Sequence, residues 1–247
     1  SSSNPATIIN KNKTKGFNSV YYPGNILFLN MFANKVHKKG IFQVSLSNLY
    51  FGRLFDQATQ YEFYANDFLL NISYKNIYKE KISYGATIKY LYSDIDTYSA
   101  HVLALSVGLR AKVLDGKIGF GASLENFGII PSDYTDSYTN TLPSTMRMAT
   151  HYKLKYLPAS IFIDYLLQLR ETDNQTIYGI KFQPNDKMLV MLSASSYKKD
   201  LKVNALYKDM LSGIAMGVRI NLNNKLINMS WKNLGPAGNC FGVGITF

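Results

Sequence analysis

The residues best suited to acid–base chemistry are the three histidines of the sequence, of which His101 has the most suggestive neighbours. Ser99 and His101 lie two positions apart, so in a β-strand their side chains share one face, as a serine nucleophile and its base would. Asp96 is the nearby candidate for the third, orienting group. A polar patch at a membrane interface explains the same residues without catalysis. We therefore predict that the protein is not an enzyme.

The other histidines lie among positive charges rather than among metal ligands. His37 belongs to a basic turn, and His151 shares a strand face with Arg147 and Lys153, as in a polar interior. The single cysteine, Cys240, permits no internal disulfide, and no Cys/His/carboxylate spacing indicates zinc. No glycine-rich phosphate loop follows the pattern of a strand and then a helix. The sequence predicts no metal and no other cofactor.

These polar residues alternate with apolar ones along strands, most clearly in the hairpin from Leu103 to Phe127. Its Asp115-Gly116 pair predicts a type I′ turn, because both residue types tolerate positive φ. That turn makes one face apolar throughout, through Val113 with Ile118, Ala111 with Phe120, Leu109 with Ala122, and Val107 with Leu124. The opposite face pairs Lys112 with Gly119, Arg110 with Gly121, Gly108 with Ser123, and Ser106 with Glu125.

Two architectures fit such a hairpin. A soluble sandwich buries its apolar face in a core, whereas a transmembrane barrel turns that face to lipid and its polar face to a lumen. The 247 residues have a mean hydropathy of −0.09 and no apolar run of about 18 residues, which excludes a helical membrane protein. The 19 Tyr and 14 Phe suit strands that cross a lipid–water interface.

The alternating pattern predicts about fourteen strands, several of them longer than the usual five or six residues of soluble folds. Their expected ranges are 17–23, 25–36, 40–52, 61–77, 79–95, 98–115, 116–127, 143–156, 157–171, 174–183, 186–197, 212–222, 225–232 and 239–247. The fold class predicted is an all-β, antiparallel, up-and-down transmembrane barrel at 17–247. Residues 1–16 are polar and irregular, and we expect them to form a short plug or tail.

The connections between strands differ by parity. Links after even-numbered strands are tight, whereas several links after odd-numbered strands are longer, as expected for periplasmic turns and outside loops. Short odd links near Ile95 and Asp173 depart from this pattern. The chain also stops on an aromatic residue, Phe247, at the end of its last strand, as outer-membrane barrels typically do. We expect the protein to lie in the bacterial outer membrane, with its carboxyl terminus on the periplasmic side.

The formal net charge of +11, from 27 Lys and Arg against 16 Asp and Glu, is spread singly along the strands. No compact basic cluster with interleaved aromatics indicates nucleic acid. We expect the charges to face the lumen, the rims, and the lipid and lipopolysaccharide of the outer membrane. The lumen-lining residues predicted are Lys89, Arg110, Arg147, Lys153 and Arg219.

Four stretches resemble the PorV/PorQ family of Bacteroidetes, barrels related to the FadL transporters and associated with type IX secretion. They are Asn4-Pro5-Ala6, Ser83 to Leu109, Leu124 to Gly128 followed by Leu142-Pro143, and Leu234 to Phe247. The family has more residues before Asn-Pro-Ala, and it often has Asp at the place of Ser106. The resemblance implies a non-enzymatic, fourteen-stranded barrel that binds secretion translocon or attachment-complex proteins.

Three functions follow as hypotheses. A protein-binding barrel would use its outside loops, at Ile129 to Thr141 and Lys198 to Met210, the second as a short amphipathic helix; the expected contact residues are Ile129, Ile130, Tyr134, Tyr138, Leu201 and Tyr207. A FadL-like transporter of hydrophobic compounds needs an apolar pocket in the lumen and a hatch that can move. The mostly small or charged inward faces argue against a large apolar pocket, with Phe162 and Leu166 as exceptions. A passive pore would prefer anions, because its inward charges are basic.

Overall fold

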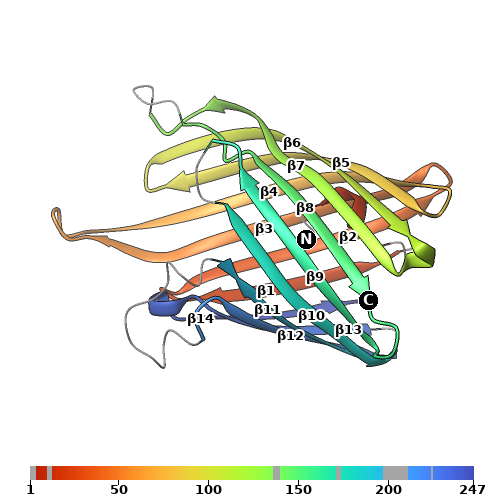
Figure 1. Cartoon of the computed structure of the whole chain (residues 1–247). Helices are drawn as coiled ribbons and strands as arrows, with labels where there is room; N and C mark the ends of the chain where they lie inside the picture. Colours follow the sequence, from red (N-terminus) through yellow and green to blue (C-terminus); the bar gives the residue numbers. More distant parts are fainter. Residues whose placement is uncertain (1–3, 10–12, 136–139, 171–173, 197–210, 224) are drawn as a thin grey trace.

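The protein is a closed β-barrel in its computed structural model, which describes residues 4–9, 13–135, 140–170, 174–196, 211–223 and 225–247 (Figure 1). Successive strands pair antiparallel, and β1 closes onto β14. The described strands are β1 (Lys15–Tyr22), β2 (Ile26–His37), β3 (Gly40–Asp56), β4 (Tyr61–Tyr78), β5 (Ile82–Ile95), β6 (Tyr98–Val113), β7 (Ile118–Ser132), β8 (Thr145–Lys153), β9 (Ala159–Gln168), β10 (Gln175–Asn185), β11 (Met188–Ser195), β12 (Ile214–Leu222), β13 (Lys225–Asn233) and β14 (Asn239–Thr246).

The predicted barrel of fourteen strands is therefore confirmed. The largest differences lie at the ends of two strands, since β3 continues to Asp56 and β7 to Ser132. Closure depends on the first and last strands, where Phe17 pairs with Ile245. The Lys15 and Phe247 backbones exchange hydrogen bonds of 3.3 and 2.8 Å. A closed sheet has no edge strand with unpaired backbone groups. Such an open edge would not be tolerated in a membrane.

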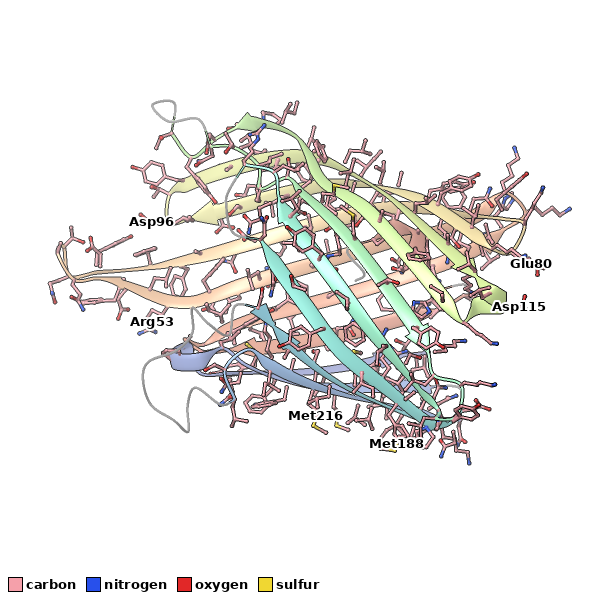
Figure 2. All side chains as sticks on the ribbon, in the orientation of Figure 1. Arg53, Glu80, Asp96, Asp115, Met188 and Met216 are labelled. Carbon is pink, nitrogen blue, oxygen red and sulfur yellow. The ribbon has the colours of Figure 1, made fainter. Side chains whose placement is uncertain are left out.

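The apolar face of the sheet points outward. Leu105, Leu109 and Phe120 remain 45%, 49% and 51% exposed, whereas Asn30 and Ser106 on the opposite face are each 1% exposed. Figure 2 shows the labelled methionines of β11 and β12 pointing away from the barrel. A soluble sandwich would bury the apolar set and expose the polar one. This inverted pattern is that of a barrel whose outer solvent is lipid.

The Leu103–Phe127 hairpin has the predicted register from Val113–Ile118 to Val107–Leu124. The turn residues Asp115 and Gly116 have φ of 53° and 78°, as a type I′ turn requires. The predicted pairing of Ser106 with Glu125 is wrong, because the register shifts between Leu105 and Val107. Asn126 has a φ of 62°, and its backbone N–H donates to Ser106 Oγ at 3.1 Å, so a bulge occupies this position.

The two ends of the barrel differ. We call the end that carries the links after even-numbered strands the tight-turn end, and the opposite end the loop end. Figure 2 shows Glu80 and Asp115 at the tight-turn end and Arg53 and Asp96 at the loop end. The β3–β4 hairpin projects furthest at the loop end (Figure 1), with strands of 17 and 18 residues. A tilted membrane crossing uses about 9–11 residues, so this hairpin extends beyond the membrane.

The helices that lie wholly within the described ranges are the short 3-10 helices η1 (Pro5–Thr7), η2 (Leu114–Gly116) and η4 (Gly235–Ala237). None of the helices described is long and apolar enough to span a membrane.

Candidate functional site

The lumen of the barrel holds the amino-terminal segment. Helix η1 contacts β4, β5 and β6 on their inner faces, and Asn4 caps it by accepting a hydrogen bond from the Ala6 backbone at 2.9 Å. The Asn4 amide also donates to the Leu109 and Ala122 carbonyls of the wall, at 3.2 and 3.1 Å. These bonds attach the Asn-Pro-Ala motif to the paired strands β6 and β7.

Glycines make room for this motif. A Cβ placed on Gly108 would lie 2.1 Å from Asn4 Oδ1, and one on Gly85 would lie 2.9 Å from the Pro5 carbonyl carbon. Gly121, on the next strand, is less crowded, because its Cβ would lie 3.7 Å from Asn4 Nδ2. The glycines at 85 and 108 therefore form a trough in which the motif lies against the backbone of the wall.

Two polar side chains of the wall hold the residues that follow η1. Lys75 is 5% exposed, and its Nζ donates to the Ile8 carbonyl at 2.7 Å. The Asn34 amide donates to the Ile9 carbonyl at 2.7 Å. Burying a charged amine is costly without partners, so this bond fixes the position of the segment. Residues 4–9 thus occupy part of the lumen along β2 and β4–β7.

The predicted lumen-lining cations lie on the inward face of their strands. Lys89 donates to Asn126 Oδ1 at 2.8 Å, Arg147 pairs with Asp164 at 3.7 Å, and Arg219 donates to Asn228 Oδ1 at 2.8 Å. Arg110 and Lys153 line a cavity at the tight-turn end. The inner face of the wall is also polar on β2–β5, where side chains bond to each other, for example Asn30 to Ser47 and Thr87 to Ser73.

A second region of the lumen is apolar. A cavity of about 360 Å³ lies on the inner face of β1 and β11–β14, towards the loop end. Its lining includes Val20, Tyr22, Met191, Ala215 and Leu234, together with the polar residues Ser193, Ser230 and Lys232. The inward faces were expected to argue against a large apolar pocket, and the structure shows that they do leave an apolar cavity of this size. The strong alternation of the neighbouring strands hid this signal, since only a few inward positions of β1 and β11 are apolar.

The predicted contact residues at the loop end have different places. Ile129 and Ile130 belong to β7 rather than to a loop, and Ile129 is 65% exposed. Tyr134 turns towards the lumen, where its hydroxyl donates to Ser93, and Ser93 donates to Asp67. The other predicted contacts, Tyr138, Leu201 and Tyr207, and the whole 198–210 stretch expected to be helical, lie outside the described residues.

Asp133 organises the loop that follows β7. The Asn140 backbone N–H and side-chain amide each donate to its carboxylate at 2.8 Å, and the Tyr134 N–H also donates at 2.8 Å. These bonds lower the pKa of the Asp133 carboxyl below its ordinary value of 3.8, and the bond from the Asn140 backbone has the largest effect.

The hydrogen bonds described for His101 and Asp96 join them to tyrosines rather than to Ser99 or to each other. His101 lies on the outer face, where its Nδ1 is 2.8 Å from the Tyr90 hydroxyl and its ring contacts Tyr92. Asp96 accepts a hydrogen bond from Tyr61 at 3.1 Å. His101 therefore forms part of an aromatic group at the membrane surface. In the described ranges, no group of three His, Cys, Asp or Glu side chains could hold a metal ion.

No protein-family model and no curated protein matches the chain. Solved structures do resemble it. The monoaromatic hydrocarbon channel CymD superimposes with a TM-score of 0.62 at 8% identity, over 98% of this chain and 89% of that chain. A mutant of the monoaromatic hydrocarbon channel TodX superimposes with a TM-score of 0.60 at 10% identity, over 99% of this chain and 91% of that chain. The outer-membrane protein Omp33 of Acinetobacter baumannii superimposes with a TM-score of 0.51 at 9% identity, over 96% of this chain and 97% of that chain. The chain thus has the fold of outer-membrane β-barrels.

Proposed function

We propose that the protein is a channel of the bacterial outer membrane for small hydrophobic molecules. The apolar cavity on the inner face of β1 and β11–β14 carries this proposal, because it offers a molecule that avoids water a place inside a mainly polar lumen. The likeness to two monoaromatic hydrocarbon channels supports the same class of substrate. The cavity lies near the loop end, where such a molecule would enter from outside the cell.

The difference between the two ends supports an orientation. Short turns face the periplasm and longer loops face outward in outer-membrane barrels, so we place the tight-turn end and Phe247 on the periplasmic side. Residues 4–9 obstruct part of the lumen, which argues that passive flow of anions is the minor activity.

Filling the cavity tests the proposal. A Cβ on Gly217 would make ordinary contacts at 3.8 and 3.9 Å, so Gly217→Phe places its ring in the cavity without breaking the strand. The control Val243→Phe adds the same ring to an outward position that is 60% exposed. We expect Gly217→Phe to reduce the flux of toluene into proteoliposomes at least fivefold and Val243→Phe to leave it unchanged. Equal flux in all three proteins would exclude the cavity as the route.

A second proposed function is protein binding of the PorV/PorQ type at the loop end. The observation in its favour is Ile129, which stays 65% exposed on β7 just before a loop rich in Tyr and Asp. An exposed apolar residue beside aromatic ones is typical of interface contacts.

The loop itself provides the test of this second function. Since 129–132 belong to β7, the deletion that spares the barrel is 133–141. We expect that deletion to abolish co-purification of secretion or attachment subunits from native membranes extracted with mild detergent. Heat-modifiable migration on gels would verify that the barrel still folds. Partners retained by a folded deletion protein would reject this loop as the docking site.

A further inference from the structure

A third feature of the lumen is a strongly basic cavity at the tight-turn end, which we call the basic vestibule. It has a volume of about 550 Å³. Five lysine or arginine side chains and one histidine line it: Lys79, Lys81, Arg110, Lys112, His151 and Lys153. Two carboxylates, Glu80 and Asp115, also reach it from the turns, and Figure 2 shows both at this end of the barrel. The net charge of the lining is strongly positive.

The register of the sheet brings these side chains together. The backbone N–H of Lys112 donates to the Lys81 carbonyl at 2.8 Å, so the two lysines lie beside each other across β5 and β6. Gly119 of β7 pairs with Lys112 on one side and with His151 on the other. A Cβ on Gly119 would lie 2.1 Å from His151 Cε1, so the histidine ring lies over this glycine. The cations of β6 and β8 therefore face one space across β7, which contributes no side chain there.

Although Glu80 and Asp115 line the same cavity, none of these cations forms an ion pair in the described residues. In the part of the chain that the structure describes, the ion pairs are Arg53–Glu62 and Arg147–Asp164, and both lie outside the vestibule. Like charges crowded into one cavity repel each other more strongly than at an open surface, since the surrounding wall screens them less than water does. An anion placed among them relieves this repulsion and gains charge-assisted hydrogen bonds.

We propose that the basic vestibule binds a phosphate-bearing anion. A guanidinium can hold two phosphate oxygens at once, which suits Arg110 to the central contact, and the lysines supply mobile point charges around it. The volume lies within the range of small-molecule sites, about 300–1,000 Å³. The ligand is either a free phosphorylated solute of the periplasm or the phosphate headgroup of a lipid that reaches the rim. This site is separate from the apolar cavity, so it holds or fails independently of the channel proposed above.

The test measures binding of inorganic pyrophosphate to the purified full chain in phosphatidylcholine nanodiscs, by titration calorimetry at low salt. We expect Arg110→Gln combined with Lys112→Gln to weaken the affinity at least tenfold. The matched control, Lys38→Gln combined with Lys187→Gln, removes the same charge from two other tight turns and should change the affinity less than twofold. Absence of binding by the wild type, or equal weakening by both double variants, would overturn the proposal.

A second arm identifies the source of the phosphate. The same titration is repeated in nanodiscs that contain phosphatidylglycerol. Loss of pyrophosphate binding in wild type, with nanodiscs of both kinds intact, supports a lipid headgroup as the occupant. Unchanged affinity supports a free phosphorylated solute. Heat-modifiable migration on gels verifies that both double variants are folded.

Discussion

Asn4 and Gly108 occupy adjoining space inside the barrel, such that a single methyl group at position 108 would lie 2.1 Å from Asn4 Oδ1. Gly108→Ala should therefore displace the amino-terminal segment from its trough and widen the lumen. We expect single-channel conductance in planar bilayers to rise at least twofold.

Gly121→Ala is the matched control, because its Cβ would lie 3.7 Å from Asn4 Nδ2, an ordinary contact. Its conductance should equal that of the wild type. A Gly108→Ala channel that conducts no better than Gly121→Ala would show that residues 4–9 do not limit flow.

Lys75 should anchor the end of this segment, through its 2.7 Å bond to the Ile8 carbonyl. Lys75→Met keeps the length of the side chain but removes the donor and leaves a buried carbonyl unpaired. Hydrogen bonds to charged groups contribute about 1.5–3 kcal/mol, so the free energy of local opening of the segment should fall by that amount. Hydrogen–deuterium exchange of residues 4–9 should accelerate at least tenfold while exchange in β12–β14 stays constant. Unaltered exchange of the segment would contradict an anchoring role.

The loop after β7 should loosen in acid. The pKa of the Asp133 carboxyl is lower in the folded loop than its ordinary value of 3.8. At pH values above 3.8 the ionised carboxylate therefore stabilises the loop fully. This stabilisation is lost as the pH falls through the lowered pKa. Limited pepsin digestion, scanned downward from pH 4, should reveal faster cleavage of this loop at the acid end. Asp133→Asn should be cleaved readily throughout, without the pH step; a step that persists in this variant would assign the effect to another group.

The outer face should reject charge where the inner face accepts it. Leu109 points to lipid and is 49% exposed, so Leu109→Lys should reduce the free energy of folding into lipid vesicles by about 2–4 kcal/mol. The control Ser230→Lys places the same charge on the inner side of β13, beside the cavity. Its folding free energy, from urea titration, should stay within about 1 kcal/mol of wild type. Equal losses in both variants would contradict the assignment of faces.

The sequence by itself determined the sheet and its two faces. A side chain's face follows from its parity along a strand, and the Asp115-Gly116 turn sets the register of its hairpin, as the Val113–Ile118 pair confirms. These are local properties, so alternation and turn chemistry are enough to predict them. The same local reasoning failed at Ser106 and Glu125, because it contains no signal for the extra residue that a bulge inserts.

The contents of the lumen were decided only by the tertiary structure. Asn4 meets Leu109 and Ala122 from more than a hundred residues away, and the apolar cavity draws single residues from strands at both ends of the chain. Closing the sheet brings β1 beside β14 and turns all inward faces toward one space. No periodicity records which inward residues then become neighbours, because that depends on how far each strand is staggered around the barrel.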